Sequence, residues 1–415
     1  MSITPLDELG RRARAASRVL GTASSAAKDD ALRAAAEVLV HRTAEVLEAN
    51  DADVGRATDA GTADTVVDRL RLTAARVEAM ADGLRQVAGL ADPVGQVVEG
   101  WTRPNGLAIE KVRVPLGVVA VIYENRPNVT SDAFGLCLKA GNAAFLRGSS
   151  AALDSNRAIA GALRDGVSKA GLPADALVLV EETSHEAAIE FMRLREWVDC
   201  LVPRGGRSLI AAVLEHATVP YVIDGDGNCH VYVDEFADLE QALEIVVNAK
   251  TQRPSVCNAA ESLVVHRSVA EAFLPRAASA LAGVALVGDA ASRSIEATIA
   301  EATDDDFGTE FLDLKMSVAV VGSLDEAIAH VNRFGTGHTE AICTRDLPSA
   351  RRFTAEVDAA AVVVNASTRF TDGEEFGFGG EIGISTQKLH ARGPMGVREL
   401  TTCKYVVTGN GQVRT

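Results

Sequence analysis

The chain has 415 residues, of which 47% are hydrophobic and only 4% aromatic, and its formal net charge is −16. This length allows two or three domains with a sizeable core, since single cores stop growing at about 250–300 residues. A strongly acidic surface repels phosphate backbones, so the charge argues against nucleic-acid binding but leaves room for a local basic pocket for a small phosphate ligand.

Neither a signal peptide nor a membrane segment is visible in the sequence. The N-terminus lacks an apolar core of signal-peptide length, and no run reaches the roughly 18 apolar residues of a membrane helix. We therefore expect a soluble, cytoplasmic protein with no membrane partner. The 6 cysteines form no CxxC pair, and their spacing suits neither a zinc site nor a disulfide scaffold, so we expect reduced thiols and no metal.

The N-terminal part is predicted to be helical. Residues 6 to about 90 have helical periodicity, with a break expected near Leu72 and Thr73. Residues 101–114 then turn at Pro104, Asn105 and Gly106 between extended flanks, which predicts a hairpin. Such a hairpin serves either in subunit contacts or as a plain surface feature.

From Gly117 onward, short apolar runs alternate with helical patterns. The first set of predicted strands lies at 117–123, 142–147, 177–180, 198–203 and 219–223. A second set lies at 230–234, 262–266, 284–288, 316–321, 340–344 and 360–365. This alternation predicts an α/β fold with two α/β domains and parallel-type sheets covered on both faces.

The C-terminal part is rich in glycine. Residues 367–394 are too long for an ordinary linker, and loops of this length in a compact domain are usually functional. The last stretch, TTCKYVVTGNGQVR, reads as a terminal strand.

Two segments of the first α/β set are candidates for a dinucleotide, although the standard GxGxxG fingerprint is missing. In LRGSS (146–150), Arg147 and Ser149 follow a strand and suit a ribose 2′-phosphate, which favours NADP over NAD. In PRGGR (203–207), Gly205 and Gly206 open a helix, where bare amides can approach a pyrophosphate. Each signal is weak by itself, because a glycine pair before a helix is more often a simple turn.

The segment YENRPN (123–128) follows the first strand directly. The side-chain amide of Asn125 or Asn128 can donate to an oxyanion, and Arg126 can meet a substrate carboxylate. The alternative reading is a turn set by Pro127.

Cys257 lies in the polar stretch TQRPSVCNAAE (251–261), between a helical pattern and an apolar strand. A loop held between rigid elements suits a nucleophile, although most cysteines are small buried hydrophobes. Cys229 stays a second candidate without a supporting motif. No histidine can be paired with Cys257 from sequence, and a cationic environment can activate a thiol without one.

Four runs together resemble the γ-glutamyl phosphate reductase branch of the aldehyde dehydrogenase superfamily. They are KVRVPLGVVAVIYENRPNVTSDAFGLCLKAGNAAFLRGSS, VPRGGRSLI, TQRPSVCNAAE and EFGFGGEIGISTQKLHARGPMGVRELTTCKY. The resemblance covers nearly the whole chain. It implies NADPH-dependent reduction of L-glutamyl 5-phosphate to L-glutamate 5-semialdehyde and phosphate, the second step of proline biosynthesis.

The resemblance also implies a division of the chain. Residues 1–100 and 116–250 are expected to form an NADP-binding domain, and residues 251–366 a catalytic domain carrying Cys257. Residues 367–394 would return past the active site, and 101–115 with 395–415 would form a small β flap for oligomerisation. A homo-oligomer and the preceding glutamate kinase are the expected protein partners.

The resemblance implies that Cys257 is the nucleophile and that it forms a thioester. The backbone N–H at the cysteine and an Asn side chain would stabilise the oxyanion. Position after the strand favours Asn125, membership in the RPNV run favours Asn128, and we rank Asn128 slightly higher. Glu310 resembles the residue that holds the nicotinamide ribose. Charge and position make Arg126, Arg369 and Arg392 candidates for substrate binding.

One departure from the wider superfamily bears on the reaction. Hydrolytic aldehyde dehydrogenases carry a Glu-Leu-Gly-Gly segment whose Glu activates water, and the corresponding region here reads IDGDGNCHVYVD. The missing base favours a thioester that exchanges with phosphate. The competing hypotheses are a hydrolytic NAD(P)-dependent aldehyde dehydrogenase acting on another small aldehyde, and a non-enzymatic scaffold for the kinase.

Overall fold

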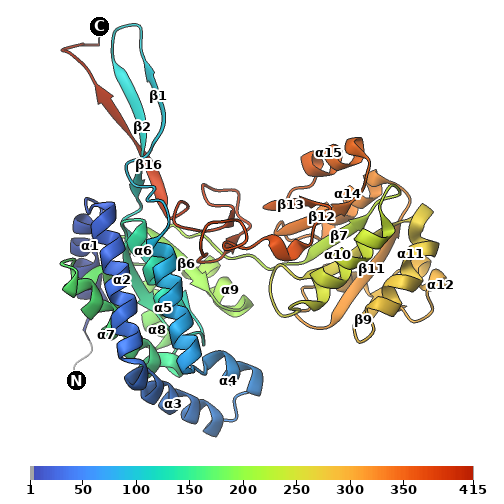
Figure 1. The fold of residues 1–415 in the computed structure, drawn as a ribbon, viewed down its shortest axis with the longest axis horizontal. Helices are drawn as coiled ribbons and strands as arrows, with labels where there is room; N and C mark the ends of the chain where they lie inside the picture. Colours follow the sequence, from blue (N-terminus) through green and yellow to red (C-terminus); the bar gives the residue numbers. More distant parts are fainter. Residues whose placement is uncertain (1–3, 415) are drawn as a thin grey trace. The chain divides into compact units, whose positions relative to one another are not determined.

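The computed structural model describes residues 4–414, which form two compact units (Figure 1). Unit 1 contains the chain up to Ile223 together with Gly377–Gly383 and the segment from Met395 onward, and unit 2 contains Asp224–Phe376 and Ile384–Pro394. The domain boundary predicted at residue 250 was wrong. Residues 224–250 belong to unit 2, because the strand that they contain pairs on both sides with strands of that unit.

The N-terminal helices of unit 1 follow the predicted pattern. The predicted break near Leu72 is confirmed, since one helix ends at Leu70 and the next is capped by Thr73, whose side chain accepts the N–H of Arg76. Buried lysines anchor this layer, and Lys139 pairs with Asp29. The helices are α1 (Leu6–Leu20), α2 (Ser25–His41), α3 (Thr43–Asp59), α4 (Asp64–Leu70) and α5 (Ala74–Ala88).

The sheet of unit 1 has 4 parallel strands in the order β5-β4-β3-β6. Its strands are continuous apolar runs, as expected where helices cover a parallel sheet. The strand predicted at 219–223 is only a single bridge between Tyr221 and Leu201, next to Pro220, which has no N–H to donate. The elements are β3 (Val118–Tyr123), α6 (Val129–Lys139), β4 (Ala143–Arg147), α7 (Leu153–Lys169), β5 (Leu177–Leu179), α8 (His185–Phe191), β6 (Cys200–Arg204) and α9 (Arg207–His216).

A separate sheet projects from the helices of unit 1 (Figure 1). The predicted hairpin forms between β1 (Val97–Thr102) and β2 (Ala108–Pro115), and the predicted terminal strand is β16 (Thr401–Thr408). Both β1 and β16 pair antiparallel with β2. The hairpin and the C-terminal strand are therefore joined, as the resemblance implied.

The sheet of unit 2 has 7 strands, all parallel, in the order β10-β9-β11-β8-β7-β12-β13. Strands β7, β8, β11, β12 and β13 contribute residues to two apolar cores, one shared with α10 and α11 and the other with α14 and α15. The strands are β7 (Cys229–Val233), β8 (Ala260–His266), β9 (Ala285–Gly288), β10 (Ala300–Glu301), β11 (Lys315–Val321), β12 (Thr339–Cys343) and β13 (Ala361–Val364). The helices are α10 (Leu239–Thr251), α11 (Arg267–Ala280), α12 (Ala290–Ile295), α13 (Asp304–Phe307), α14 (Leu324–Phe334) and α15 (Leu347–Glu356).

The glycine-rich segment contributes to both units. In unit 2, β14 (Ile384–Ser385) pairs antiparallel with β15 (Gly393–Pro394). The carboxylate of Asp224 accepts the N–H of Ile384 at 2.9 Å, which ties this short ribbon to the start of unit 2. Within residues 4–414, no helix is long and apolar enough to cross a membrane.

Candidate active site

In unit 1, Asn125 and Ser149 meet beyond the carboxyl ends of β3 and β4. The Ser149 hydroxyl donates to Asn125 Oδ1 at 3.0 Å. Asn125 has a left-handed backbone with φ 40°, a conformation that non-glycine residues rarely adopt. Strained backbone of this kind clusters at functional sites, where the surrounding structure holds it in place.

Arg147 lies at the end of β4 and is 7% exposed. Its Nη2 donates to the carbonyl of Ser184 at 2.7 Å. Its Nε is buried and has no hydrogen-bond partner within residues 4–414. Burial lowers the pKa of Arg147. The guanidinium is therefore a buried donor group with capacity left for an anionic or hydroxyl-bearing ligand.

Gly205 and Gly206 form the turn between β6 and α9, as the sequence predicted. The N–H of Gly206 donates to the carboxylate of Glu124 at 2.9 Å. A Cβ on Gly205 would lie 2.5 Å from the same carboxylate. The amide expected to face a pyrophosphate is thus occupied by a side chain that the sequence did not single out.

Asn128 and Arg126 are exposed on the turn that leads into α6. Asn128 precedes the helix, and its Nδ2 donates to Asp132 at 2.8 Å. Burial raises the pKa of Asp132 to about 6, although the hydrogen bonds from Asn128 and Ser131 oppose this shift. Asn128 therefore acts locally at the start of α6, whereas Asn125 Oδ1 contacts Ser149 beyond the end of β4.

In unit 2, Cys257 occupies a turn between α10 and β8. The N–H of Ala259 donates to the carbonyl of Val256 at 3.1 Å, which closes the turn around Cys257 and Asn258. Cys257 is partly exposed, while Asn258 is buried and its amide donates to the carbonyl of Thr371 at 2.9 Å. The structure thus presents the predicted nucleophile on a short, anchored turn.

Two arginines, Arg253 and Arg369, lie close to each other near this turn. The Nε of Arg369 donates to Gln252 at 2.8 Å. Burial lowers the pKa of Arg369 and the neighbouring Arg253 lowers it further, while negative charge at Asp372 and at Cys257 raises it. Because nearby cations favour a thiolate over a thiol, this environment suits a reactive cysteine.

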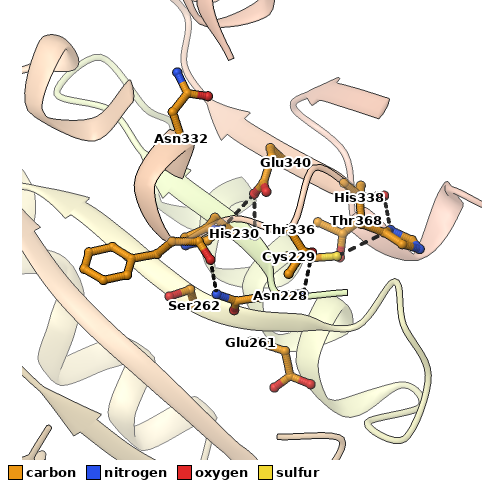
Figure 2. A network of polar contacts seen from close by, with 12 residues as sticks. Asn228, Cys229, His230, Glu261, Ser262, Asn332, Thr336, His338, Glu340 and Thr368 are labelled. Carbon is orange, nitrogen blue, oxygen red and sulfur yellow. Dashed lines mark hydrogen bonds and ion pairs between the residues drawn. The ribbon is translucent and has the colours of Figure 1, made fainter. Parts of the chain in front are cut away.

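A buried polar network lies at the amino ends of β7, β8 and β12 (Figure 2). His230 Nδ1 lies 2.9 Å from Glu340, and Asn228 donates to the carbonyls of Phe307 and Phe334 at 2.8 Å. Cys229 Sγ lies 3.7 Å from His338 Nδ1. The contact between His230 and Glu340 links the amino ends of β7 and β12.

Two glutamates anchor the loop before β11, Glu310 from within the loop and Glu261 from β8. Glu310 Oε1 accepts the N–H of Gly227 at 2.8 Å. Glu261 accepts the N–H of Leu312 at 3.1 Å and pairs with Lys250 at 2.5 Å, with both side chains fully buried. Desolvation raises the pKa of Glu261 to about 7.

Arg392 belongs to a different group of residues. Its Nη2 donates to Asp358 at 2.8 Å, and Lys388 pairs with the same carboxylate. Both cations line a polar pocket of unit 2 together with Asn332 and Thr336. Among the three arginines suggested by sequence, Arg369 has Cys257 in its electrostatic environment.

Sequence reasoning missed Glu124, Gly227, Lys250 and Glu261. Lys250 ends a helical pattern and Glu261 precedes an apolar strand, on either side of Cys257. Two opposite charges at these positions were the signal that could have indicated a buried ion pair. Gly227 lies in IDGDGN, where its close contact with residues 30 positions away leaves no local signature.

Comparison with known proteins places this chain among well-defined relatives. The aldehyde dehydrogenase family model matches residues 4–306 and 316–406. A γ-glutamyl phosphate reductase of Clostridium beijerinckii is 55% identical over 98% of each chain, and one of Thermobifida fusca is 54% identical with the same coverage. The crystal structure of γ-glutamyl phosphate reductase from Thermotoga maritima matches with a TM-score of 0.97 and 47% identity, over 99% of this chain and 100% of that one.

Proposed function

Since this chain belongs to the aldehyde dehydrogenase family, we propose that it reduces L-glutamyl 5-phosphate to L-glutamate 5-semialdehyde and phosphate with NADPH, as the second step of proline biosynthesis. The observation that carries the proposal is Cys257 on an anchored turn in a cationic environment. Relatives of 54–55% identity over 98% of the chain bear the name of this reductase, which supports the same reading.

In the proposed reaction, the Cys257 thiolate attacks the acyl carbon of the substrate. A C–S bond forms, the C–O bond to phosphate breaks, and phosphate leaves with the electron pair. Arg253 and Arg369 stabilise the negative charge at the thiolate and at the incoming acyl phosphate. NADPH, when bound, supplies the hydride that reduces the resulting thioester to the aldehyde.

Asn125 is our preferred oxyanion donor, the reverse of the ranking suggested by the RPNV run. The side-chain NH₂ group of Asn128 donates to Asp132. In Asn125, by contrast, the side-chain oxygen accepts a hydrogen bond from the Ser149 hydroxyl. That orientation leaves the NH₂ group of Asn125 for an oxyanion. Its positive φ supports a functional role for this residue.

Arg147 and Ser149 fit the ribose phosphate of NADP, because the buried Nε of Arg147 lacks a partner within residues 4–414. Gly205 and Gly206 would approach the pyrophosphate once Glu124 moves from the Gly206 amide. Glu310 would hold the nicotinamide ribose. Arg369 is the preferred partner for the substrate carboxylate, with Arg126 and Arg392 as further candidates.

The β1-β2-β16 sheet is proposed to join subunits of a homo-oligomer. Its exposed apolar side chains support this role; they are Val97, Val98, Trp101, Tyr405, Val406 and Val407. The preceding kinase remains a proposed partner. We also propose a cytoplasmic location, which suits the 6 free cysteines.

Oxidation of the semialdehyde in the reverse direction tests this function. We expect turnover to require inorganic phosphate, to be faster with NADP than with NAD, and to disappear in Cys257→Ala. The matched control is Cys403→Ala, a partly exposed cysteine on β16. Turnover without phosphate that yields free acid would instead establish the hydrolytic aldehyde dehydrogenase.

A further inference from the structure

The segment before β7 touches the backbone of the Cys257 turn. A Cβ on Gly227 would lie 1.5 Å from the carbonyl oxygen of Cys257, so only glycine allows the observed approach. The Sγ of Cys229 lies 3.1 Å from the same oxygen. Two residues of one segment therefore contact a single carbonyl group of the candidate nucleophile.

This carbonyl belongs to the central peptide of the turn from Val256 to Ala259. Turn types I and II differ by a flip of the central peptide, and type II requires a positive φ at the third residue. Asn258 is that third residue, and the non-glycine residues with positive φ within 4–414 are Asn125, Leu312 and Asn365. The turn is therefore not type II, and its carbonyl orientation matches the contacts with Gly227 and Cys229.

We propose that Cys229 is a positioning residue, whose thiol hydrogen bond to the Cys257 carbonyl holds the central peptide of the nucleophile turn in one orientation against Gly227. The inference rests on the proposed role of Cys257. Because a flip of this peptide changes the backbone on the carbonyl side of Cys257, it would displace the nucleophile and the backbone amides beside it.

The surroundings of Cys229 keep its thiol protonated, so that the S–H group can donate a hydrogen bond. The side chain is fully buried, and burial raises the pKa of its thiol well above the usual range, with the charges of Glu340, Cys257 and Glu261 adding to the shift. His338, on the other side of the sulfur, is held neutral because burial lowers its pKa to about 4. The thiol therefore stays protonated and donates, which also removes Cys229 as a competing nucleophile.

The positioning segment is itself fixed on both sides of the contact. Glu310 accepts the N–H of Gly227, and Thr336 Oγ1 accepts the N–H of Asn228 at 3.1 Å. On the turn, the Thr368 hydroxyl donates to the carbonyl of Asn258 at 2.7 Å. Consecutive carbonyls of the nucleophile turn are thus held by hydroxyl and thiol donors from separate elements.

The test compares Cys229→Ala, Cys229→Ser and the control Cys343→Ala, a buried cysteine of β12. We expect Cys229→Ala to lower kcat about three- to fivefold without changing KM, since a single weak S–H···O hydrogen bond is lost. Cys229→Ser keeps a donor and should recover kcat to within about twofold of wild type. Cys343→Ala should match wild type, and thermal unfolding midpoints of the two Ala variants report any shared loss of packing.

A second readout avoids both cofactor and phosphate. Acylation of the enzyme by 4-nitrophenyl acetate releases a burst of 4-nitrophenolate, and Cys257→Ala should abolish this burst. The burst rate should fall in Cys229→Ala and recover in Cys229→Ser. Equal rates in wild type and Cys229→Ala, equal losses in Cys229→Ala and Cys343→Ala, or a Cys229→Ser variant as slow as Cys229→Ala would each overturn the proposal. Phosphate-independent oxidation by wild type would refute the proposed function instead, and the burst rates would still decide the role of Cys229.

Discussion

The two units place their candidate residues at opposite ends of their parallel strands. In unit 1, Arg147 ends β4, and Asn125 and Gly205 follow the carboxyl ends of β3 and β6. In unit 2, Cys229 begins β7, and Cys257 precedes the amino end of β8. The same architecture thus carries two different kinds of site.

The difference follows from what each end of a parallel sheet offers. Carboxyl ends lead into helix N-termini, whose amides and positive dipole suit an anionic cofactor. The amino ends in unit 2 carry instead a buried network of side chains, including the pairs His230–Glu340 and Lys250–Glu261. Unit 1 therefore offers hydrogen-bond donors for a ligand, whereas unit 2 uses its donors to hold the turn at Cys257.

The largest effect is expected on the stability of the fold, when the buried Lys250–Glu261 pair is broken. Lys250→Met leaves Glu261 buried without its cation, and breaking such a pair costs about 3–5 kcal/mol of unfolding free energy. Because the pKa of Glu261 is already raised to about 7, the folded state binds its proton more tightly than the unfolded state does. Lys250 itself lowers that pKa, so its loss raises the pKa further, and the extra penalty in the variant is largest above pH 7 and shrinks as the pH falls through 7, below which Glu261 is protonated in both folded proteins.

Denaturant unfolding of Lys250→Met and wild type at pH 8 and pH 5 measures this difference. The exposed pair Arg276–Glu240 provides the control, since Glu240→Gln should change stability by less than about 1 kcal/mol. A Lys250→Met penalty that is small or that grows on acidification would show that the buried pair does not stabilise unit 2.

In unit 1, Asn125→Gly should lower kcat by about 10²–10³-fold, because an oxyanion donor is lost while glycine keeps the positive φ without strain. Asn128→Gly is the matched variant, and its kcat should stay within about threefold of wild type, a change of less than about 0.7 kcal/mol. Steady-state reduction kinetics distinguish them. The opposite order would restore Asn128 as the donor.

The next effect on kcat is expected from the close contact of Gly227 with the Cys257 carbonyl. Gly227→Ala should lower kcat by about 10²-fold, since a Cβ displaces the nucleophile turn by something of the order of an ångström. Gly55→Ala in α3, where an added Cβ meets nothing within 4 Å, should leave kcat unchanged. If Gly227→Ala retains full activity, the close contact does not position the nucleophile.

The smallest effect tests cofactor choice. Arg147→Met should raise KM for NADP about 10- to 100-fold and leave KM for NAD nearly unchanged, because a charge-assisted hydrogen bond contributes about 1.5–3 kcal/mol. Arg157→Met on the exposed face of α7 is the control. Equal losses with both cofactors would assign Arg147 a structural role through Ser184.

Local pattern predicted most of the fold, because amphipathic helices and apolar strands are properties of short segments. The alternation of strands and helices put 230–234 in the second set, where β7 pairs with β8 and β12, whereas the boundary at 250 came from the resemblance. Pro220 has no N–H to donate, which explains why residues 219–223 form a single bridge in place of the predicted strand.

Candidate residues can be proposed from sequence where their chemistry lies in one segment, as at Cys257 and Arg147. Gly227 and Glu124 were missed because each acts through contact with a distant segment. The ranking of Asn125 and Asn128 depended on backbone φ and on the hydrogen bond to Asp132. Sequence spacing alone contains neither quantity.

Cys257 is proposed to carry an acyl thioester that phosphate, and not water, releases. Acid-quenched enzyme from a phosphate-free mixture of glutamate 5-semialdehyde and NADP should show one glutamyl adduct by intact mass, mapped to Cys257, and a pulse of phosphate before the quench should remove it. The absence of an adduct, an adduct on another residue, or its loss to free glutamate without phosphate would contradict the account.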